Sequence, residues 1–215
     1  MSEKELLKKL ASYIRLTWDR QLTESTGGNM SVRIGDKVYI TPTFVIKHFF
    51  TEDDFTVLDM SGNKLSGKLK ASSEYKMHLR IYKERKEIKC VFHSHPRWSL
   101  VHAVTHKKVP SEILPETAIL LHEIDYLKYC LPGTDEFADK FTKGLREGKK
   151  IFMLENHGVT SIGENIEETY SRLEVLETCC FVSTMCDLVK EKTHKIPQDE
   201  LKTLHQMITG NPFVK

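Results

Sequence analysis

The sequence predicts a protein of the α/β or α+β class whose sheet is at least partly antiparallel. Stretches with the apolar spacing of helices alternate along the chain with short β-rich runs. Two of these runs, 30–34 and 37–41, are separated only by Gly35 and Asp36, as in a β-hairpin. The 215 residues contain no internal repeat and no linker, so a single domain over residues 1–215 is expected.

The first part of the chain shows one helix followed by short strands. Residues 3–22 carry apolar side chains at mostly three- and four-residue steps, which predicts an amphipathic helix: Leu6, Leu7, Leu10, Tyr13, Ile14 and Trp18. A loop with two glycines, 25–29, separates this helix from the hairpin. Residues 55–60 form a further β-rich run, and residues 61–64 have the composition of a turn.

The middle of the chain changes from helix to strand and back to helix. Ser72 or Ser73 is a suitable N-cap for a helix that runs to about residue 85, which places Glu74 in the first helical turn. A strand is expected at 88–95. Pro96 then begins another helix, since proline is tolerated in a first turn.

The C-terminal part repeats this alternation. Thr134 resembles an N-cap of a helix that extends to about residue 147. Strands are expected at 150–154 and 157–162, and a long helix follows at 165–190. The tail, 197–215, has the pattern of one short helix.

Composition and charge disfavour several functional classes. Hydrophobic residues make up 40% of the chain and charged residues 29%, which supports a folded core. With a net charge of +2, neither nucleic acid nor an anionic membrane is expected as the main partner. No apolar run resembles a signal peptide or a membrane span. The five cysteines form no CxxC motif, so free thiols in a reducing cytoplasm are expected.

His93-Ser94-His95 is the most informative motif in the sequence. On a strand, residues i and i+2 face the same side, so both imidazoles can reach one metal ion. A catalytic zinc usually takes three protein ligands and keeps one position open. His157 is the candidate third ligand, because it follows an expected strand and precedes Gly158, where the backbone can bend. The competing interpretation is unrelated histidines in a chain that contains ten.

The metal expected at this motif is zinc, which suits three imidazoles and an open position. Manganese, cobalt or iron can take the same ligands. The remaining histidines show no comparable spacing, and surface or packing roles are expected for them: His48, His78, His102, His106, His122, His194 and His205.

Glu74 has two interpretations. The helix dipole favours an acid in a first turn, so Glu74 can be a capping acid and nothing more. Placed beside a metal, the same carboxylate can act as a general base. It can remove a carbon-bound proton when a metal on the adjacent carbonyl oxygen stabilises the carbanion as an enediolate.

Three short segments are rich in hydrogen-bond donors that suit a phosphate. Residues 26–29, with the sequence TGGN, offer a hydroxyl, an amide and open backbone N–H groups, and residues 41–43 add two more hydroxyls. Ser72 and Ser73 stand at a helix N-terminus, where free N–H groups favour an anion. Each segment alone is more often a turn or a cap. Together they can form a phosphate site without arginine.

Taken in order, these segments resemble the class II aldolase and adducin family, and in motif most closely its L-fuculose-phosphate aldolases. The shared pattern is TxGN at 26–29, TP[TS] at 41–43, SSE at 72–74, HxH at 93–95 and NHG at 156–158. The resemblance covers roughly residues 6–188. Five separated segments in the same order are much more specific than any one of them.

The resemblance implies a fold, an assembly and a site. It implies a three-layer domain with a central, mainly antiparallel sheet flanked by helices, assembled as a homotetramer with the active site at a subunit interface. It implies that His93, His95 and His157 bind one Zn²⁺ per subunit, with Glu74 as acid/base and as a fourth ligand before substrate arrives. The residues that it implies for the substrate phosphate are Gly28, Asn29, Thr43, Phe44, Ser72 and Ser73.

The sequence departs from the family pattern at two places. Phe44 stands where the family commonly has glycine. No tyrosine occurs at 112–117, where fuculose-phosphate aldolases use one that reaches in from a neighbouring subunit. Glu116 can replace it as a proton donor to the leaving aldehyde, or it can be an interface acid. The tail ends at 211–215 without the tyrosine that relatives often contribute.

The expected function is a zinc-dependent aldolase that reversibly cleaves a ketose 1-phosphate, such as L-fuculose 1-phosphate, to dihydroxyacetone phosphate and a small aldehyde. A pentulose-5-phosphate 4-epimerase and a methylthioribulose-1-phosphate dehydratase remain alternatives. Glu74 disfavours the epimerase, because the epimerases usually have aspartate there, and it also favours the aldolase over the dehydratase. The non-enzyme alternative is an adducin-like binding module, which the three retained histidines disfavour.

Overall fold

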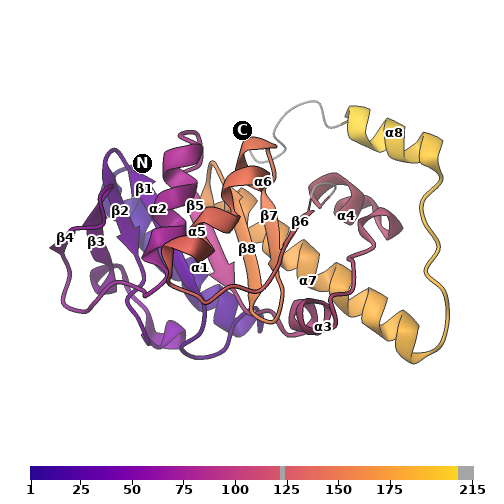
Figure 1. Cartoon of the computed structure of the whole chain (residues 1–215), viewed down its shortest axis with the longest axis horizontal. Helices are drawn as coiled ribbons and strands as arrows, with labels where there is room; N and C mark the ends of the chain where they lie inside the picture. The colour runs from indigo at the N-terminus through magenta and orange to yellow at the C-terminus, as the bar shows by residue number, and fades with distance from the viewer. Residues whose placement is uncertain (122–123, 208–215) are drawn as a thin grey trace.

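The computed structural model describes residues 1–121 and 124–207 (Figure 1). Within these residues, eight strands form one sheet, in this order across it: β4 (Lys64–Ser66), β3 (Thr56–Asp59), β2 (Lys37–Ile40), β1 (Asn29–Ile34), β5 (Cys90–Ser94), β8 (Gly158–Gly163), β7 (Ile151–Leu154) and β6 (Ile124–Leu127). All neighbouring strands are antiparallel except β6 and β7, which run parallel.

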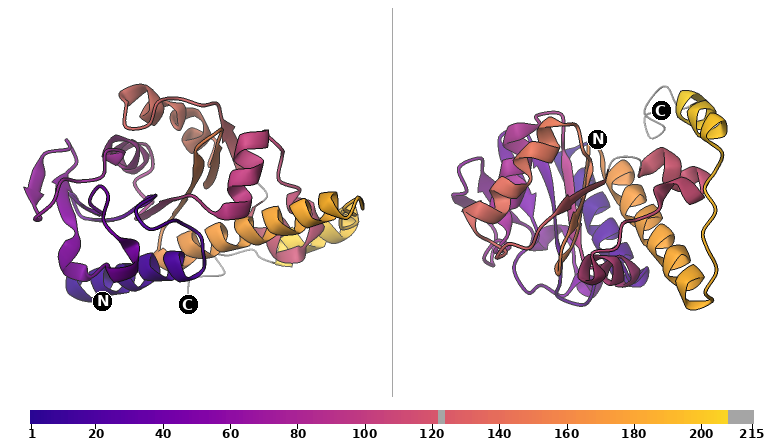
Figure 2. Two further views of the ribbon diagram at one scale, coloured as in Figure 1. Left: turned by 90° about the horizontal axis from the view of Figure 1, so that it is seen from below. Right: turned by 45° about the vertical axis from the view of Figure 1, so that its right-hand side comes forward.

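Helices cover both faces of the sheet and give the molecule three layers (Figure 2). One face carries α2 (Tyr75–Glu84), α5 (Asp135–Lys140) and α6 (Thr142–Arg146). The other face carries α1 (Glu3–Asp19), α3 (Arg97–Thr105) and α7 (Ile166–Leu188). Two further helices lie beyond the sheet: α4 (Pro115–Leu120) packs on α7, and α8 (Gln198–Met207) packs on α4 (Figure 1).

Strand residues alternate between the two helical layers. In β5, Cys90 and Phe92 pack with the apolar cluster of the α1 and α7 side, whereas Val91 packs with that of α2, α5 and α6. Full burial of a side chain such as Phe92 contributes about 1.5–3 kcal/mol to the free energy of folding. By the same alternation, His93 faces the α2 side, and this places its imidazole next to the residue that precedes α2.

The expected fold class is confirmed, since a central, mostly antiparallel sheet is flanked by helices. The prediction that Ser72 or Ser73 is the N-cap of α2 was wrong by one or two residues. The helix begins at Tyr75, and its N-cap is Glu74, so this acid precedes the first turn. The hydroxyl of Ser72 instead accepts a hydrogen bond from the Glu74 backbone N–H, at 3.3 Å.

Several elements escape the sequence pattern. The strands β4 and β6 were missed, because β4 is exposed along its whole length and β6 is only half buried, so neither shows apolar alternation. The short helix α4 was missed as well. The expected helix after Thr134 is split into α5 and α6 at Phe141, whose N–H bonds the carbonyl of Ala138 rather than the i−4 carbonyl. Thr134 is confirmed as the N-cap of α5, and Asn165, at which the long helix was expected to begin, is the N-cap of α7.

The expectations for His122 and for the tail residues 211–215 lie outside the described residues. None of the helices within 1–121 and 124–207 combines the length and the apolar character needed to cross a bilayer.

Candidate metal centre

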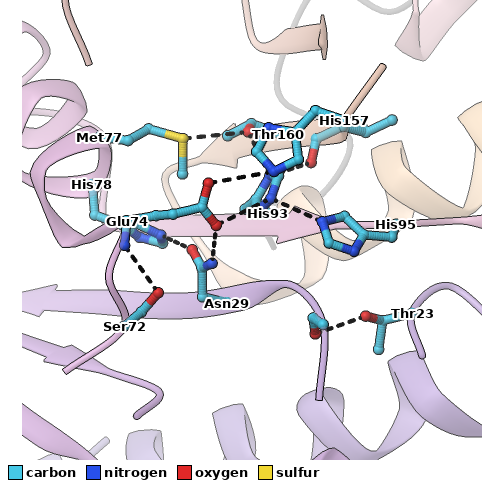
Figure 3. A network of polar contacts seen from close by, with 12 residues as sticks. Thr23, Asn29, Ser72, Glu74, Met77, His78, His93, His95, His157 and Thr160 are labelled. Carbon is cyan, nitrogen blue, oxygen red and sulfur yellow. Dashed lines mark hydrogen bonds and ion pairs between the residues drawn. The ribbon is translucent and has the colours of Figure 1, made fainter. Parts of the chain in front are cut away.

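Three histidines from two distant segments converge at one end of the sheet (Figure 3). His93 lies in β5, His95 follows directly after this strand, and His157 lies in the turn between β7 and β8. Because Ser94 pairs with Val159, the turn that precedes β8 lies against the end of β5. One ring nitrogen from each histidine lies within 4.8 Å of the others, so the expected convergence is present.

The ring of His93 is held in one orientation by the strand beside it. Its Nδ1 lies 3.0 Å from the carbonyl oxygen of Val159 and 3.2 Å from the hydroxyl of Thr160. Since a carbonyl oxygen only accepts hydrogen bonds, Nδ1 carries the proton and Nε2 presents its lone pair. The residue has no exposed surface, so the ring has no alternative partner in solvent.

The ring of His95 is oriented by a carboxylate. Glu24 accepts a hydrogen bond from His95 Nδ1 at 2.8 Å, and this bond lowers the pKa of Glu24. The proton on Nδ1 leaves His95 Nε2 as a lone-pair donor, 3.2 Å from His93 Nε2. A carboxylate behind a ligand histidine is the usual way in which proteins fix its tautomer at a metal.

The histidine cluster fits a divalent cation. Two unprotonated nitrogens that face each other at 3.2 Å repel unless a positive charge lies between or beside them. Burial lowers the pKa of His157 to about 4 and holds that of His93 well below its usual value, so both rings are neutral near pH 7. Neutral imidazole is the form that binds metal.

Glu74 completes the donor set from the α2 side. Its Oε2 lies 3.4 Å from His93 Nε2, and its Oε1 lies 3.4 Å from His157 Nε2. Among the described residues, Oε1 is buried without a hydrogen-bond partner. Burial raises the pKa of Glu74 above its ordinary value, while the hydrogen bond from Asn29 and the nearby His95 act in the opposite direction. Three imidazoles and one carboxylate are a donor set that suits zinc.

A chain of buried hydrogen bonds leads from Glu74 through Asn29 to His78 and orients the Glu74 carboxylate (Figure 3). Asn29 donates from Nδ2 to Glu74 Oε2 at 2.6 Å, and its Oδ1 lies 2.6 Å from His78 Nε2. Since Oδ1 only accepts, His78 donates from Nε2, and its Nδ1 accepts from the hydroxyl of Ser31 at 2.7 Å. The chain ends at Tyr82, whose hydroxyl lies 2.7 Å from that of Ser31.

His78 thus has a positioning role that the sequence analysis missed. Burial lowers its pKa to about 3, so the ring stays neutral and keeps one tautomer. The available signal was its spacing, because residues four apart in a helical segment lie on one side and His78 follows Glu74 by four. A surface or packing role alone does not describe it.

The three segments expected to hold a phosphate meet beside this centre. Thr43 N–H donates to Lys70 O at 3.1 Å, and Ser72 N–H donates to Thr41 O at 3.1 Å, so residues 70–72 lie along residues 41–43. Gly28 has a φ of +66°, and a Cβ there would lie 2.6 Å from the carbonyl oxygen of His93. Only glycine allows this loop to pack directly on β5.

Within this group, Asn29 and Ser72 are buried, whereas Ser73 is exposed. Thr43 is partly buried. Phe44 adopts a left-handed backbone with a φ of +54°, and its side chain is 82% exposed. The phenylalanine therefore keeps the backbone conformation that a glycine would favour and, within one chain, directs its ring to solvent.

Glu116 lies apart from this constellation within one chain. It is exposed in the first turn of α4. No hydrogen bond or ion pair joins it to the described residues of the metal centre. A role in a neighbouring subunit's site, as the sequence suggests, needs contact with a second chain.

His95 also forms part of the wall of a cavity of about 710 Å³. The residues that line it include Trp18, Gln21, Thr23, Glu24, Arg97 and Leu100. Within this wall, Arg97 donates a hydrogen bond to the side chain of Gln21 at 2.8 Å. The space is large enough for a small sugar.

Known proteins are similar to this chain in both sequence and fold. Residues 8–184 match the family described as Class II Aldolase and Adducin N-terminal domain. An L-fuculose phosphate aldolase of Methanocaldococcus jannaschii is 35% identical over 185 residues, which cover 86% of this chain and 98% of the relative. A 5-methylthioribulose-1-phosphate/5-deoxyribulose-1-phosphate aldolase of Escherichia coli is 30% identical, over 79% of this chain and 78% of the relative.

A solved structure of an L-fuculose 1-phosphate aldolase superposes with a TM-score of 0.86 at 25% identity, and the match covers 98% of this chain and 99% of that one. The family match and the relative that is 35% identical each extend over more than two thirds of this chain. The chain belongs to the class II aldolase and adducin family.

Proposed function

We propose that this protein is a divalent-metal aldolase, with zinc as the metal, that reversibly cleaves a ketose 1-phosphate to dihydroxyacetone phosphate and a small aldehyde. The observation that carries the proposal is that the Glu74 carboxylate lies 3.4 Å from Nε2 of His93 and 3.4 Å from Nε2 of His157. The aldolase relatives support the reaction class, and L-fuculose 1-phosphate is the first substrate to test.

Each residue has a distinct part in this proposal. His93, His95 and His157 would hold the metal, which when bound would polarise the substrate carbonyl and stabilise the negative charge that develops there. Glu74 would hold and return the proton at the carbon where the bond breaks. Asn29 orients its carboxylate by the hydrogen bond at 2.6 Å.

The phosphate would bind where the loop 26–29, the segment 41–44 and the two serines converge. The proposed contacts come from Gly28, Asn29, Thr43, Phe44, Ser72 and Ser73. Gly28 supports this assignment, because its packing on the His93 carbonyl sets the loop close to the metal centre. The far end of the sugar would extend toward the cavity beside His95.

The test is aldehyde release from L-fuculose 1-phosphate, with 5-deoxyribulose 1-phosphate as a second substrate because a relative acts on it. Activity should disappear on dialysis against a chelator and return with Zn²⁺. Glu74→Gln should retain the metal and lose roughly 10²- to 10⁴-fold in kcat, the range for removing a general acid/base. Cleavage that persists in metal-free protein would refute the proposal.

Product analysis separates the alternatives. An epimerase returns an isomeric pentulose phosphate, and a dehydratase releases water and no aldehyde. A binding module gives neither product. The retention of three converging histidines argues against such a module, as it did in the sequence.

We further propose a homotetramer in which Glu116 of one subunit serves the active site of its neighbour. The C-terminal part of α7 and the residue that follows it present exposed apolar side chains that suit burial by another chain: Phe181, Met185, Leu188 and Val189. Glu74→Gln and Glu116→Gln subunits, each of low activity, should regain activity when they are mixed and reassembled. No recovery in mixed oligomers would place Glu116 outside the active site.

The domain organisation and compartment follow as proposals of the same kind. One sheet with an apolar layer on each face supports a single domain over residues 1–215. The five cysteines are all free thiols, which supports a reducing compartment such as the cytoplasm.

A further inference from the structure

Lys47 is completely buried, which is rare for a lysine. It begins the short 3₁₀-helix η1 (Lys47–Phe49), and its exposed fraction is 0%. Buried lysines are normally paired with a carboxylate, because removing an unpaired ammonium from water is costly. Within 4.0 Å of Lys47 Nζ there is no carboxylate oxygen of a described residue. A buried cation without a close counter-ion calls for another explanation.

The ammonium group joins the two loops that were assigned to the phosphate. Lys47 Nζ donates to the carbonyl of Thr26 at 3.3 Å and to that of Val45 at 3.2 Å. Thr26 directly precedes Gly27 and Gly28, and Val45 directly follows Phe44. The backbone N–H of Lys47 also donates to the carbonyl of Ser25, at 3.0 Å. Through its ammonium group, Lys47 thus links the loop that contains Thr26 to the loop that contains Val45.

The charge environment of Lys47 is unbalanced in the absence of an anion. Burial lowers its pKa to about 8, and the attraction of Glu24 opposes this shift only in part. Glu24 itself accepts the hydrogen bond from His95. Near neutral pH the ammonium is therefore mainly protonated, and it would interact favourably with an anion that entered the adjacent loops.

We propose that Lys47 is the buried cation of the phosphate site, where its ammonium positions the two donor loops and supplies the positive charge for a phosphomonoester. The inference rests on the proposed function for the identity of the substrate. It explains how loops that contain only neutral donors can favour a doubly charged phosphate without arginine. Lys47 acts on the ligand through the loops and through its charge, so it is a positioning residue.

The experiment compares three substitutions at this position in the metal-loaded protein. Lys47→Gln keeps a polar head without the charge, Lys47→Met keeps only the stem, and Lys47→Arg keeps the charge. Lys37→Met is the matched control, because it removes the same charge from an exposed site at the opposite end of the β1–β2 hairpin. Thermal unfolding first establishes which variants are folded. If Lys47→Met does not fold, the comparison rests on Lys47→Gln.

Binding of inorganic phosphate is measured by calorimetry, and KM and kcat are measured on L-fuculose 1-phosphate. In Lys47→Gln, phosphate affinity should fall and KM should rise by roughly 10- to 100-fold, the range for losing an interaction with a charged group, while kcat changes little. Binding of the phosphate-free analogue dihydroxyacetone should not change. Lys47→Arg should recover part of the phosphate affinity, and Lys37→Met should match the unmodified protein.

The proposal is overturned if Lys47→Gln binds phosphate within about twofold of Lys37→Met, or if both ligands weaken equally, as expected from a purely structural role. Failure of the function is a different result. If the unmodified protein binds phosphate in a Lys47-dependent way and cleaves no ketose phosphate, the site stands and the aldolase assignment falls. If the unmodified protein cleaves the substrate and the substitutions at Lys47 leave KM unchanged, the aldolase assignment stands and the role of Lys47 in the phosphate site falls.

Discussion

The candidate metal centre and the loops proposed to bind the phosphate are built in different ways. His93 lies in a central strand and His95 follows it directly, and in each ring the nitrogen that points away from the centre donates to a fixed acceptor. Apart from Asn29, which begins β1, the donors proposed for the phosphate lie on loops, and these loops are held by main-chain hydrogen bonds, by the close packing of Gly28 and by Lys47.

This difference reflects what each ligand requires. A metal ion accepts ligand atoms only within a few tenths of an ångström of about 2 Å, so its ligands need rigid anchoring, which here comes from the pairing of β5 with β8. A phosphate has several oxygens that accept hydrogen bonds from many directions, so well-anchored loops are sufficient. Substitutions should therefore have steep effects at the candidate metal centre and shallow effects in the loops.

The largest effect is expected from His157→Ala. Loss of one of three imidazoles should reduce bound metal, measured by mass spectrometry of the purified protein, from about one ion per chain to nearly none. Activity should fall by roughly a thousandfold or more, since the metal contributes several kcal/mol to transition-state stabilisation. His194→Ala, at an exposed position, is the control. Full metal content in the His157 variant would break the comparison.

Glu24→Gln should have the next largest effect, on metal affinity. Gln can still accept the hydrogen bond from His95 and lacks the charge. Loss of a carboxylate behind a ligand histidine typically weakens metal binding by about 10- to 100-fold, which a chelator titration would measure. The exposed acid Glu87 provides a control in Glu87→Gln. Equal affinities in the two variants would show that Glu24 does not support the site.

His78→Gln tests the hydrogen-bond chain behind Glu74. Disturbing the bond that orients Asn29 should lower kcat by roughly tenfold, since buried hydrogen bonds of this kind are worth about 1–3 kcal/mol. KM and metal content should stay the same. Tyr82→Phe, which alters only the far end of the chain, should have a smaller effect on kcat. A similar loss in both variants would indicate a general structural defect.

Phe44→Gly should have the smallest effect. Glycine relieves the left-handed backbone, which costs other residues about 1–2 kcal/mol, and it loses part of this gain because it is more flexible when unfolded. The Tm should rise by about 2 °C or less, in calorimetry, with KM nearly unchanged. A clear fall in Tm would mean that the Phe44 ring, exposed in one chain, is covered in the assembly.

The sequence was sufficient for the fold class and for the histidine cluster. The i, i+2 spacing of His93 and His95 was enough to predict that both rings lie on the same side, because alternate residues of an extended chain face the same way. The pairing of His157 with them was expected from its place after a strand. The β5–β8 pairing that brings them together is a long-range contact, and only the resemblance to a family suggested it.

The residues that sequence missed are those whose role depends on tertiary packing. Nothing in the local pattern distinguishes Lys47 from an exposed lysine, since its burial arises from the way in which the neighbouring loops close over it. The role of His78 also depends on tertiary packing, because its tautomer is fixed by Ser31 and Asn29 from β1, although its four-residue spacing from Glu74 was a local signal. The strands β4 and β6 escaped because their partial exposure removes the alternation that identifies strands.

The position of β5 between β1 and β8 has a thermodynamic consequence. The donors at the metal centre meet only after the central strand has joined neighbours that come from opposite ends of the sequence. Unfolded or half-folded chains thus offer no equivalent set of ligands, and an ion held by these donors would bind only the native state. Linkage then requires that free ion at about a hundred times its dissociation constant adds roughly 2.7 kcal/mol to the unfolding free energy. The same ion that serves the chemistry would also protect the fold from heat and proteolysis.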